Sequence, residues 1–137
     1  MSKLDDRPPP VYFMEREGLV FAGLHLLIDL WEAERLDDLE LMRAVFVDCV
    51  AASGATLRSL DLFQFADGGG IAGIAMLTQS HISVHSWPEH GYGAFDVFVC
   101  GNAQPYAIIA VLGRAFRPKQ IQVTEQKRGL RFRAEGM

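Results

Sequence analysis

One short stretch of this chain combines residue types that can attack a carbonyl group and move protons. Ser80 begins the segment Ser80-His81-Ile82-Ser83-Val84-His85-Ser86-Trp87-Pro88-Glu89, and Cys100 closes the apolar run that follows. A serine hydroxyl is a potential nucleophile, whereas imidazole and thiol groups have pKa values that modest shifts bring near neutrality. Residues of these types can carry out nucleophilic and acid–base chemistry, but a single Ser-His pair at the start of a strand is more often structural.

This segment resembles the processing and active-site segment of the prokaryotic S-adenosylmethionine decarboxylase proenzymes. The stretches 23–30, 53–56 and 91–98 are also similar to segments of that family, in the family's order. The resemblance covers roughly residues 18 to 129. The joint occurrence of Ser80, His85, Trp87, Glu89 and Cys100 at the family's spacing makes it specific.

The resemblance implies a self-processing enzyme. Ser80 would attack the carbonyl of Gln79, and the chain would cleave between these two residues to leave a pyruvoyl group. That group forms a Schiff base with a substrate amine and accepts the electrons left when carbon dioxide departs. By the same resemblance His85 is the processing base and Cys100 the proton donor. His81, His85 and His90 are residue types that can bind a metal, but no matching pattern of Cys or Asp/Glu ligands accompanies them, so we expect no metal.

Three functions fit these residues. The first is decarboxylation of S-adenosylmethionine for polyamine synthesis, in which Phe63, Phe65 or Trp87 would contact the adenosyl sulfonium. The second is decarboxylation of arginine or ornithine, for which Asp67 or Glu89 would supply a carboxylate. The third is a non-enzymatic, unprocessed relative that regulates an active paralog.

This chain differs from the family pattern in the loop 65–69, where the family has histidine and proline, and at two single positions. The family usually has Glu before the cleaving serine, where this chain has Gln79, and only the backbone carbonyl of that residue reacts. The family typically has Gly-Val-Ser-Gly where this chain has Gly70-Ile71-Ala72-Gly73, and that serine assists processing. A hydrogen bond to a charged centre contributes about 1.5–3 kcal/mol, so Ala72 predicts slower self-cleavage.

Composition restricts the class of protein. With 137 residues, of which 50% are hydrophobic, the chain can bury one core, and we expect a leader at 1–10 and one domain at 11–137. The net charge of −4 disfavours nucleic acid as a partner, and no apolar run has the length of a membrane span. Two cysteines are too few for a disulfide scaffold and suggest the cytoplasm.

The hydrophobic periodicities predict alternating strands and helices. Helical spacing predicts a helix over 36–52 and a second one capped by Asn102 with Pro105 in its first turn. Shorter apolar runs predict strands at 23–30, 55–65, 70–78, 81–87, 93–100, 120–124 and 130–133. Two strand–helix–strand–strand units result, which predicts a two-layer α+β sandwich with a largely antiparallel sheet and both helices on one face.

Strand geometry adds an expectation about assembly. The simplest hairpin places Trp87 opposite Gly93, and Cys100 then lies level with Ser80. His85, however, lies five residues along the strand from Ser80, or about 17 Å. We therefore expect a homodimer, or a higher assembly, in which one chain's Ser80 meets the partner's His85 and the small amine substrate binds at a shared site.

Overall fold

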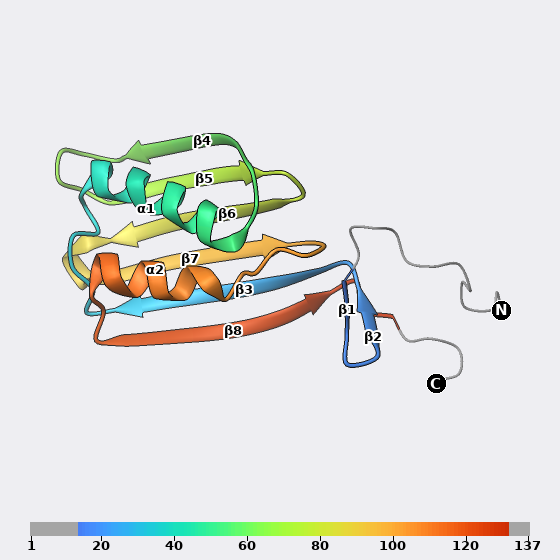
Figure 1. The fold of residues 1–137 in the computed structure, drawn as a ribbon. Coiled ribbons are helices and arrows are strands. Elements are labelled where there is room, and N and C mark those ends of the chain that lie inside the picture. The colour runs from blue at the N-terminus through green and yellow to red at the C-terminus, as the bar shows by residue number, and fades with distance from the viewer. Residues whose placement is uncertain (1–13, 132–137) are drawn as a thin grey trace.

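The computed structural model describes residues 14–131. Its elements are β1 (Met14–Arg16), β2 (Leu19–Phe21), β3 (Gly23–Trp31), α1 (Leu39–Ser53), β4 (Leu57–Gln64), β5 (Ile71–Leu77), β6 (Ser80–Trp87), a 3₁₀ turn (Pro88–His90), β7 (Tyr92–Val99), α2 (Ala107–Phe116) and β8 (Gln120–Arg128). Six strands form one antiparallel sheet in the order β4-β5-β6-β7-β3-β8, and β1 and β2 form a separate hairpin. Both helices lie on the same face of the large sheet (Figure 1). The predicted α+β sandwich is therefore confirmed.

The first helix, α1, has a clear start and stop in the sequence. The carboxylate of Asp38 accepts a hydrogen bond from the backbone N–H of Leu41 at 2.9 Å, so the helix begins three residues later than predicted. Gly54 ends it in the left-handed conformation, with φ of 80°. The apolar stripe, which includes Met42, Phe46 and Cys49, packs into the core.

The second helix differs from the prediction at its start. It begins at Ala107 with Tyr106 as the preceding cap residue, so Asn102 does not cap it and Pro105 lies outside it. Gly101 has a φ of 66° and turns the chain directly after β7, which leaves Asn102 in a turn. Side chains of α2 that point to the sheet, such as Leu112 and Phe116, are fully buried.

The two faces of the sheet differ in cover. Alternate residues of β3, from Leu24 to Leu30, are at most 1% exposed beneath the helices. The other face, which we call the open face, has no helix of residues 14–131 on it (Figure 1). Six large apolar side chains on it are between 38% and 60% exposed: Leu27, Trp31, Phe63, Ile74, Met76 and Trp87.

Several predicted boundaries need correction. The last sheet strand, β8, is one continuous strand of nine residues paired along β3, not a short strand at 120–124. At the predicted strand 130–133, Arg131 forms an isolated bridge to Val20 in place of a strand. Residues 132–133 lie outside the described residues, as does the predicted leader at 1–10. The small hairpin of β1 and β2 was not predicted. Within the described part of the chain, none of the helices has the length and apolar character needed to cross a membrane.

Candidate active site

The predicted cleavage point lies in a tight, strained turn. Leu77 pairs with Ser80, so Thr78 and Gln79 alone connect β5 to β6. Gln79 has a φ of 66°, in the left-handed region that favours glycine. A non-glycine residue held there costs on the order of 1–3 kcal/mol, and such strain clusters at functional sites. The Gln79–Ser80 peptide bond follows the strained residue directly.

Ser80 opens β6 and lines a pocket at this end of the sheet. The residue is 7% exposed. A pocket of about 250 Å³ is formed where the loop after α1, the turn before β6 and the loop after β7 meet, and its lining is Gly54, Ala55, Thr56, Thr78, Gln79, Ser80, Cys100, Asn102 and Ala103. The structure thus brings together the two residues predicted to carry the carbonyl chemistry, Ser80 and Cys100.

The Cys100 thiol is suited to donate a proton. Burial raises the pKa of this thiol above its ordinary value, because a thiolate is poorly solvated there. Cys100 therefore stays protonated at neutral pH. The other cysteine, Cys49, is packed in the core, and its pKa is raised to about 12 by burial and by the negative charge of Asp48.

The predicted register of the hairpin is wrong by one residue. Trp87 pairs with Tyr92 rather than with Gly93, and the same register sets Ser80 opposite Val99, one residue before Cys100. The 3₁₀ turn causes the difference, since the N–H of Gly91 closes it onto the carbonyl of Pro88 at 3.1 Å. Cys100 reaches the Ser80 pocket because it lies beyond the end of β7, not because the two residues are paired.

His85 lies away from its own Ser80. The two residues are five positions apart on β6, which corresponds to about 17 Å along the strand. They also have opposite orientations: Ser80 belongs to the buried alternation of β6, whereas His85 is exposed on the open face. Ala72 of β5 lies directly across from His85. The residue expected to act as base and the position of the family's assisting serine are therefore neighbours.

Two pockets meet at His85. One, of about 340 Å³, is lined by Asp61, Phe63, Ala72, Gly73, Ile74, Ser83 and His85. The other, of about 330 Å³, is lined by Phe65, Gly70, His85, Ser86, Trp87 and Glu89. Four of the five predicted substrate-binding residues, Phe63, Phe65, Trp87 and Glu89, thus gather around His85. The fifth, Asp67, lies in the turn between β4 and β5 and lines neither pocket.

The Ser86 hydroxyl fixes the backbone beside these pockets by two hydrogen bonds. It accepts a hydrogen bond from the backbone N–H of Ile71 at 2.9 Å and donates one to the carbonyl of Leu36 at 3.0 Å. Gly70 passes so close to β6 that a Cβ atom there would lie 2.5 Å from the carbonyl oxygen of Ser86. The Gly70-Ile71 backbone is therefore fixed against β6 beside His85.

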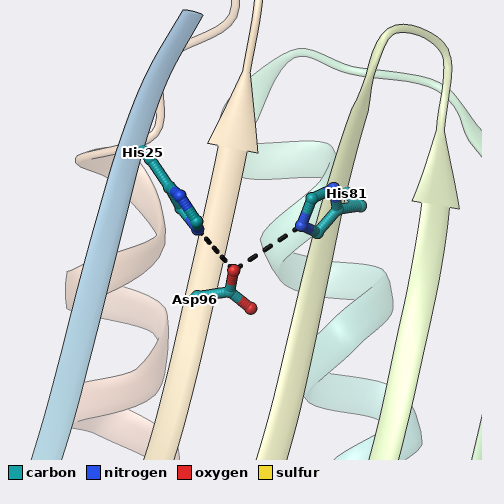
Figure 2. Close-up of side chains that lie close together, drawn as sticks. All are labelled: His25, His81 and Asp96. Atoms are coloured by element: carbon teal, nitrogen blue, oxygen red, sulfur yellow. Dashed lines mark hydrogen bonds and ion pairs between the residues drawn. The ribbon is translucent and has the colours of Figure 1, made fainter. Parts of the chain in front are cut away.

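A cluster of three polar side chains that the sequence did not predict lies on the same open face. Figure 2 shows the side chains of His25 and His81 converging on the carboxylate of Asp96 from two neighbouring strands. From the sequence we expect His25 to be packed or hydrogen-bonded between layers, and its proximity to Asp96 could not be predicted because it depends on β3 lying beside β7. The signal that finds them is the cross-strand register: Phe98 pairs with both His25 and His81.

Comparison with known proteins connects this geometry with a family. Residues 24–129 match the family model described as S-adenosylmethionine decarboxylase. A protein of Thermomicrobium roseum named S-adenosylmethionine decarboxylase proenzyme is 43% identical over 109 residues, covering 79% of this chain and 94% of that protein. A protein of the same name from Methanococcus maripaludis is 40% identical over 111 residues, covering 79% of this chain and 90% of that protein.

A solved structure is similar over the same part of the chain. The crystal structure of the adenosylmethionine decarboxylase from Aquifex aeolicus superimposes with a TM-score of 0.68 at 32% identity. The superposition covers 78% of this chain and 90% of the other.

Proposed function

Because the chain belongs to the S-adenosylmethionine decarboxylase family, it is a decarboxylase, and we propose that it acts on S-adenosylmethionine with a pyruvoyl group made from its own Ser80. The observation that carries the proposal is the position of Ser80, which directly follows the strained Gln79 and shares a pocket with Cys100. Decarboxylated S-adenosylmethionine supplies aminopropyl groups for polyamine synthesis, which places the reaction in that biosynthesis.

The turn between β5 and β6 supports self-cleavage. The Ser80 hydroxyl adds to the Gln79 carbonyl carbon and the Ser80 nitrogen leaves, so that the peptide bond becomes an ester. A base then removes the Ser80 Cα proton, the Gln79 carboxylate departs, and hydrolysis of the resulting dehydroalanine releases ammonia. Cleavage also releases the strain at Gln79, whose φ of 66° is needed only while the turn is intact.

The residues of the Ser80 pocket fit a pyruvoyl group. Ser80 is buried, so the carbonyl that replaces it is shielded from water, and the Cys100 thiol beside it remains protonated. The pyruvoyl group supplies an electrophilic carbonyl that binds the substrate amine and accepts the electrons of the departing carboxylate. Cys100 then supplies the proton that replaces the carboxylate on the substrate carbon.

We also propose that each working site is built from two copies of the chain. Ser80 and His85 of one chain lie about 17 Å apart along β6 and belong to opposite faces of the sheet. A two-fold dimer repeats every contact, so it can bring the partner's His85 pocket to Ser80 twice. The six exposed apolar side chains on the open face give this second copy a surface to bury.

The gathering of aromatic side chains around His85 suits the substrate. The rings of Phe63 and Phe65 are arranged edge to face with their centroids 5.2 Å apart, and His85 stacks on Trp87 with the ring centroids 6.2 Å apart. Aromatic faces bind an adenine ring by stacking and a sulfonium by cation–π attraction. Glu89 lines the pocket that Phe65 and Trp87 also line, where its carboxylate can accept hydrogen bonds from a ribose or an amine.

We place the enzyme in the cytoplasm, in keeping with two cysteines that are both free.

Intact mass spectrometry of the purified protein tests the proposal. We expect two fragments that correspond to residues 1–79 and 80–137, the second carrying an N-terminal pyruvoyl group in place of serine. The cleaved protein should release carbon dioxide from S-adenosylmethionine and not from arginine or ornithine. An intact chain without activity would contradict self-processing, and release from arginine or ornithine alone would contradict the substrate.

A further inference from the structure

The open face carries a second group of chemically capable side chains, apart from the Ser80 and His85 pockets. His25 on β3 and His81 on β6 both pair with Phe98, which lies on β7 between them. Asp96 lies two residues before Phe98 on β7 and therefore points to the same face. Figure 2 shows both imidazole rings directed at one carboxylate oxygen of Asp96.

The donor atoms of the three residues lie close together. The Nε2 atom of His25 is 2.5 Å from Oδ2 of Asp96, and Nε2 of His81 is 3.5 Å from the same oxygen. One ligand atom from each residue fits within a span of 4.8 Å. The side chains retain some access, with 20% of His25, 34% of His81 and 19% of Asp96 exposed.

Neighbouring side chains hold the three residues in this arrangement. The Ser83 hydroxyl donates a hydrogen bond to Oδ1 of Asp96, which leaves Oδ2 to the imidazoles. The Phe98 ring lies edge to face with His25, with the ring centroids 5.6 Å apart, and stacks on His81, with the ring centroids 6.0 Å apart. Such contacts orient ligands before a metal arrives, as the supporting groups around metal ligands do.

We propose that His25, His81 and Asp96 bind a divalent transition-metal ion of the zinc class. Two imidazoles and one carboxylate suit Zn²⁺, Co²⁺ or Ni²⁺, whereas Mg²⁺ and Ca²⁺ prefer oxygen ligands alone. Ligand atoms around tetrahedral zinc lie about 3.3 Å apart, close to the 3.5 Å between His81 and Asp96. The 2.5 Å between His25 and Asp96 would open when the ion replaces the hydrogen between them.

The coordination is incomplete with these three ligands, which leaves the remaining position to water or to a group of the facing copy. The ion would tie β6, β7 and β3 together across the open face. Because His81 directly follows Ser80, one ligand belongs to the strand that begins at the cleavage site.

The metal site itself needs neither the pyruvoyl group nor decarboxylation, so its test is independent of the function proposed above.

Arg128 gives the proposal a specific consequence. Its guanidinium lies 3.5 Å from Nδ1 of His25. Because a guanidinium can only donate, this contact favours the tautomer in which Nδ1 is the acceptor and Nε2 carries the proton, towards Asp96. A metal bound at Nε2 requires the proton to move to Nδ1, where it would face the donors of Arg128. Arg128 therefore opposes metal binding both by this contact and by its charge.

Equilibrium titration with Co²⁺, followed by visible absorption, tests the site in the full chain. We expect one ion per chain, with the absorption of a tetrahedral site, and a rise in the melting temperature on loading. His25→Gln, His81→Gln and Asp96→Asn should each weaken binding at least about tenfold.

His90→Gln is the matched control, since His90 is an exposed histidine of the 3₁₀ turn outside the cluster. This variant should bind Co²⁺ as tightly as the native chain. Arg128→Gln should strengthen binding severalfold.

X-ray absorption of the native, zinc-loaded chain provides the test that needs no variant. We expect only nitrogen and oxygen neighbours, with two of them imidazoles. Sulfur at about 2.3 Å would assign the ion to a cysteine and overturn the proposal. Failure of the native chain to bind Co²⁺, or binding that survives Asp96→Asn and His81→Gln, would overturn it as well. Unchanged or weaker binding in Arg128→Gln would overturn ligation through Nε2 of His25.

Discussion

Ala72 lies directly across from His85 in the antiparallel pair of β5 and β6, and both residues line the same pocket of about 340 Å³. Residues in this relation have Cα atoms about 4.5–5.5 Å apart. Ala72, one of the positions expected to differ from the family pattern, therefore lies beside the residue expected to act as processing base. Both belong to the open face, away from the Ser80 pocket of the same chain.

A hydroxyl at position 72 should speed self-cleavage. In Ala72→Ser the new hydroxyl would lie beside His85 and, in the shared site, donate a hydrogen bond to the charge that develops on the carbonyl of the partner's Gln79. Such a bond contributes about 1.5–3 kcal/mol, so we expect the half-time of cleavage to fall by about ten- to a hundredfold. The half-time is measured by denaturing gel on freshly purified chain.

Ala94→Ser is the matched control for this change. Ala94 lies across from His85 on the other side, in β7, but does not line the pocket that Ala72 lines. We expect no acceleration in this variant. An equal acceleration would show that polarity near His85 suffices, and an unchanged half-time in Ala72→Ser would exclude a role for that position.

Relief of the strain at Gln79 should slow cleavage and stabilise the precursor. Glycine adopts a φ of 66° without the cost that glutamine bears, so Gln79→Gly should raise the free energy of unfolding of the uncleaved chain by about 1 kcal/mol. If that strain is released in the transition state, the half-time lengthens by up to about tenfold. Gln79→Glu keeps the strain and should cleave at the native rate. Faster cleavage in Gln79→Gly would contradict a role for strain.

Removal of the thiol should separate cleavage from decarboxylation. In Cys100→Ala we expect cleavage to proceed, because no step of the self-cleavage proposed here uses the thiol, while turnover of S-adenosylmethionine falls or ends in inactivation by incorrect protonation. Cys49→Ala, which removes the thiol buried in the core, should lower stability but keep the turnover of the folded enzyme. Native turnover in Cys100→Ala would show that another group is the proton donor.

The pH dependence of turnover should reflect the raised pKa of Cys100. The thiol can donate only while protonated, and burial raises its pKa above the ordinary thiol value of about 8.5. Activity should therefore persist above that pH and decline only at higher pH. The decline should disappear from the residual activity of Cys100→Ser, which does not titrate in this range. A decline centred below about pH 8.5 would contradict a buried, neutral donor.

The sequence predicts the parts of this molecule whose signals are local. The helical stripe of Met42, Phe46 and Cys49 and the strand beginning at Ser80 are periodic patterns within single elements, and both are present. Membership of the family follows from one contiguous motif, from Ser80 to Glu89, and three shorter ones.

Features that depend on pairing between distant segments could not be predicted. The group of His25, His81 and Asp96 requires β3 to pair with β7, and nothing near His25 in the sequence indicates that partner. The predicted register of the hairpin between β6 and β7 was wrong for a local reason. The left-handed Gly91 closes the turn one residue earlier than the simplest hairpin would, so Trp87 pairs with Tyr92. The extent of β8 was underestimated because its last residues, including Lys127 and Arg128, are polar, although they still pair with β3.

Co-expression of two defective chains tests whether each active site is shared between two copies of the chain. Ser80→Ala lacks the nucleophile and His85→Ala lacks the base, so neither should cleave alone. In a mixed dimer, one site combines the intact Ser80 of the His85→Ala chain with the intact His85 of the Ser80→Ala chain. With chains of different tag mass, we expect cleavage of the His85→Ala chain only. If mixed dimers are isolated and both chains remain intact, His85 acts within its own chain and the shared site is wrong.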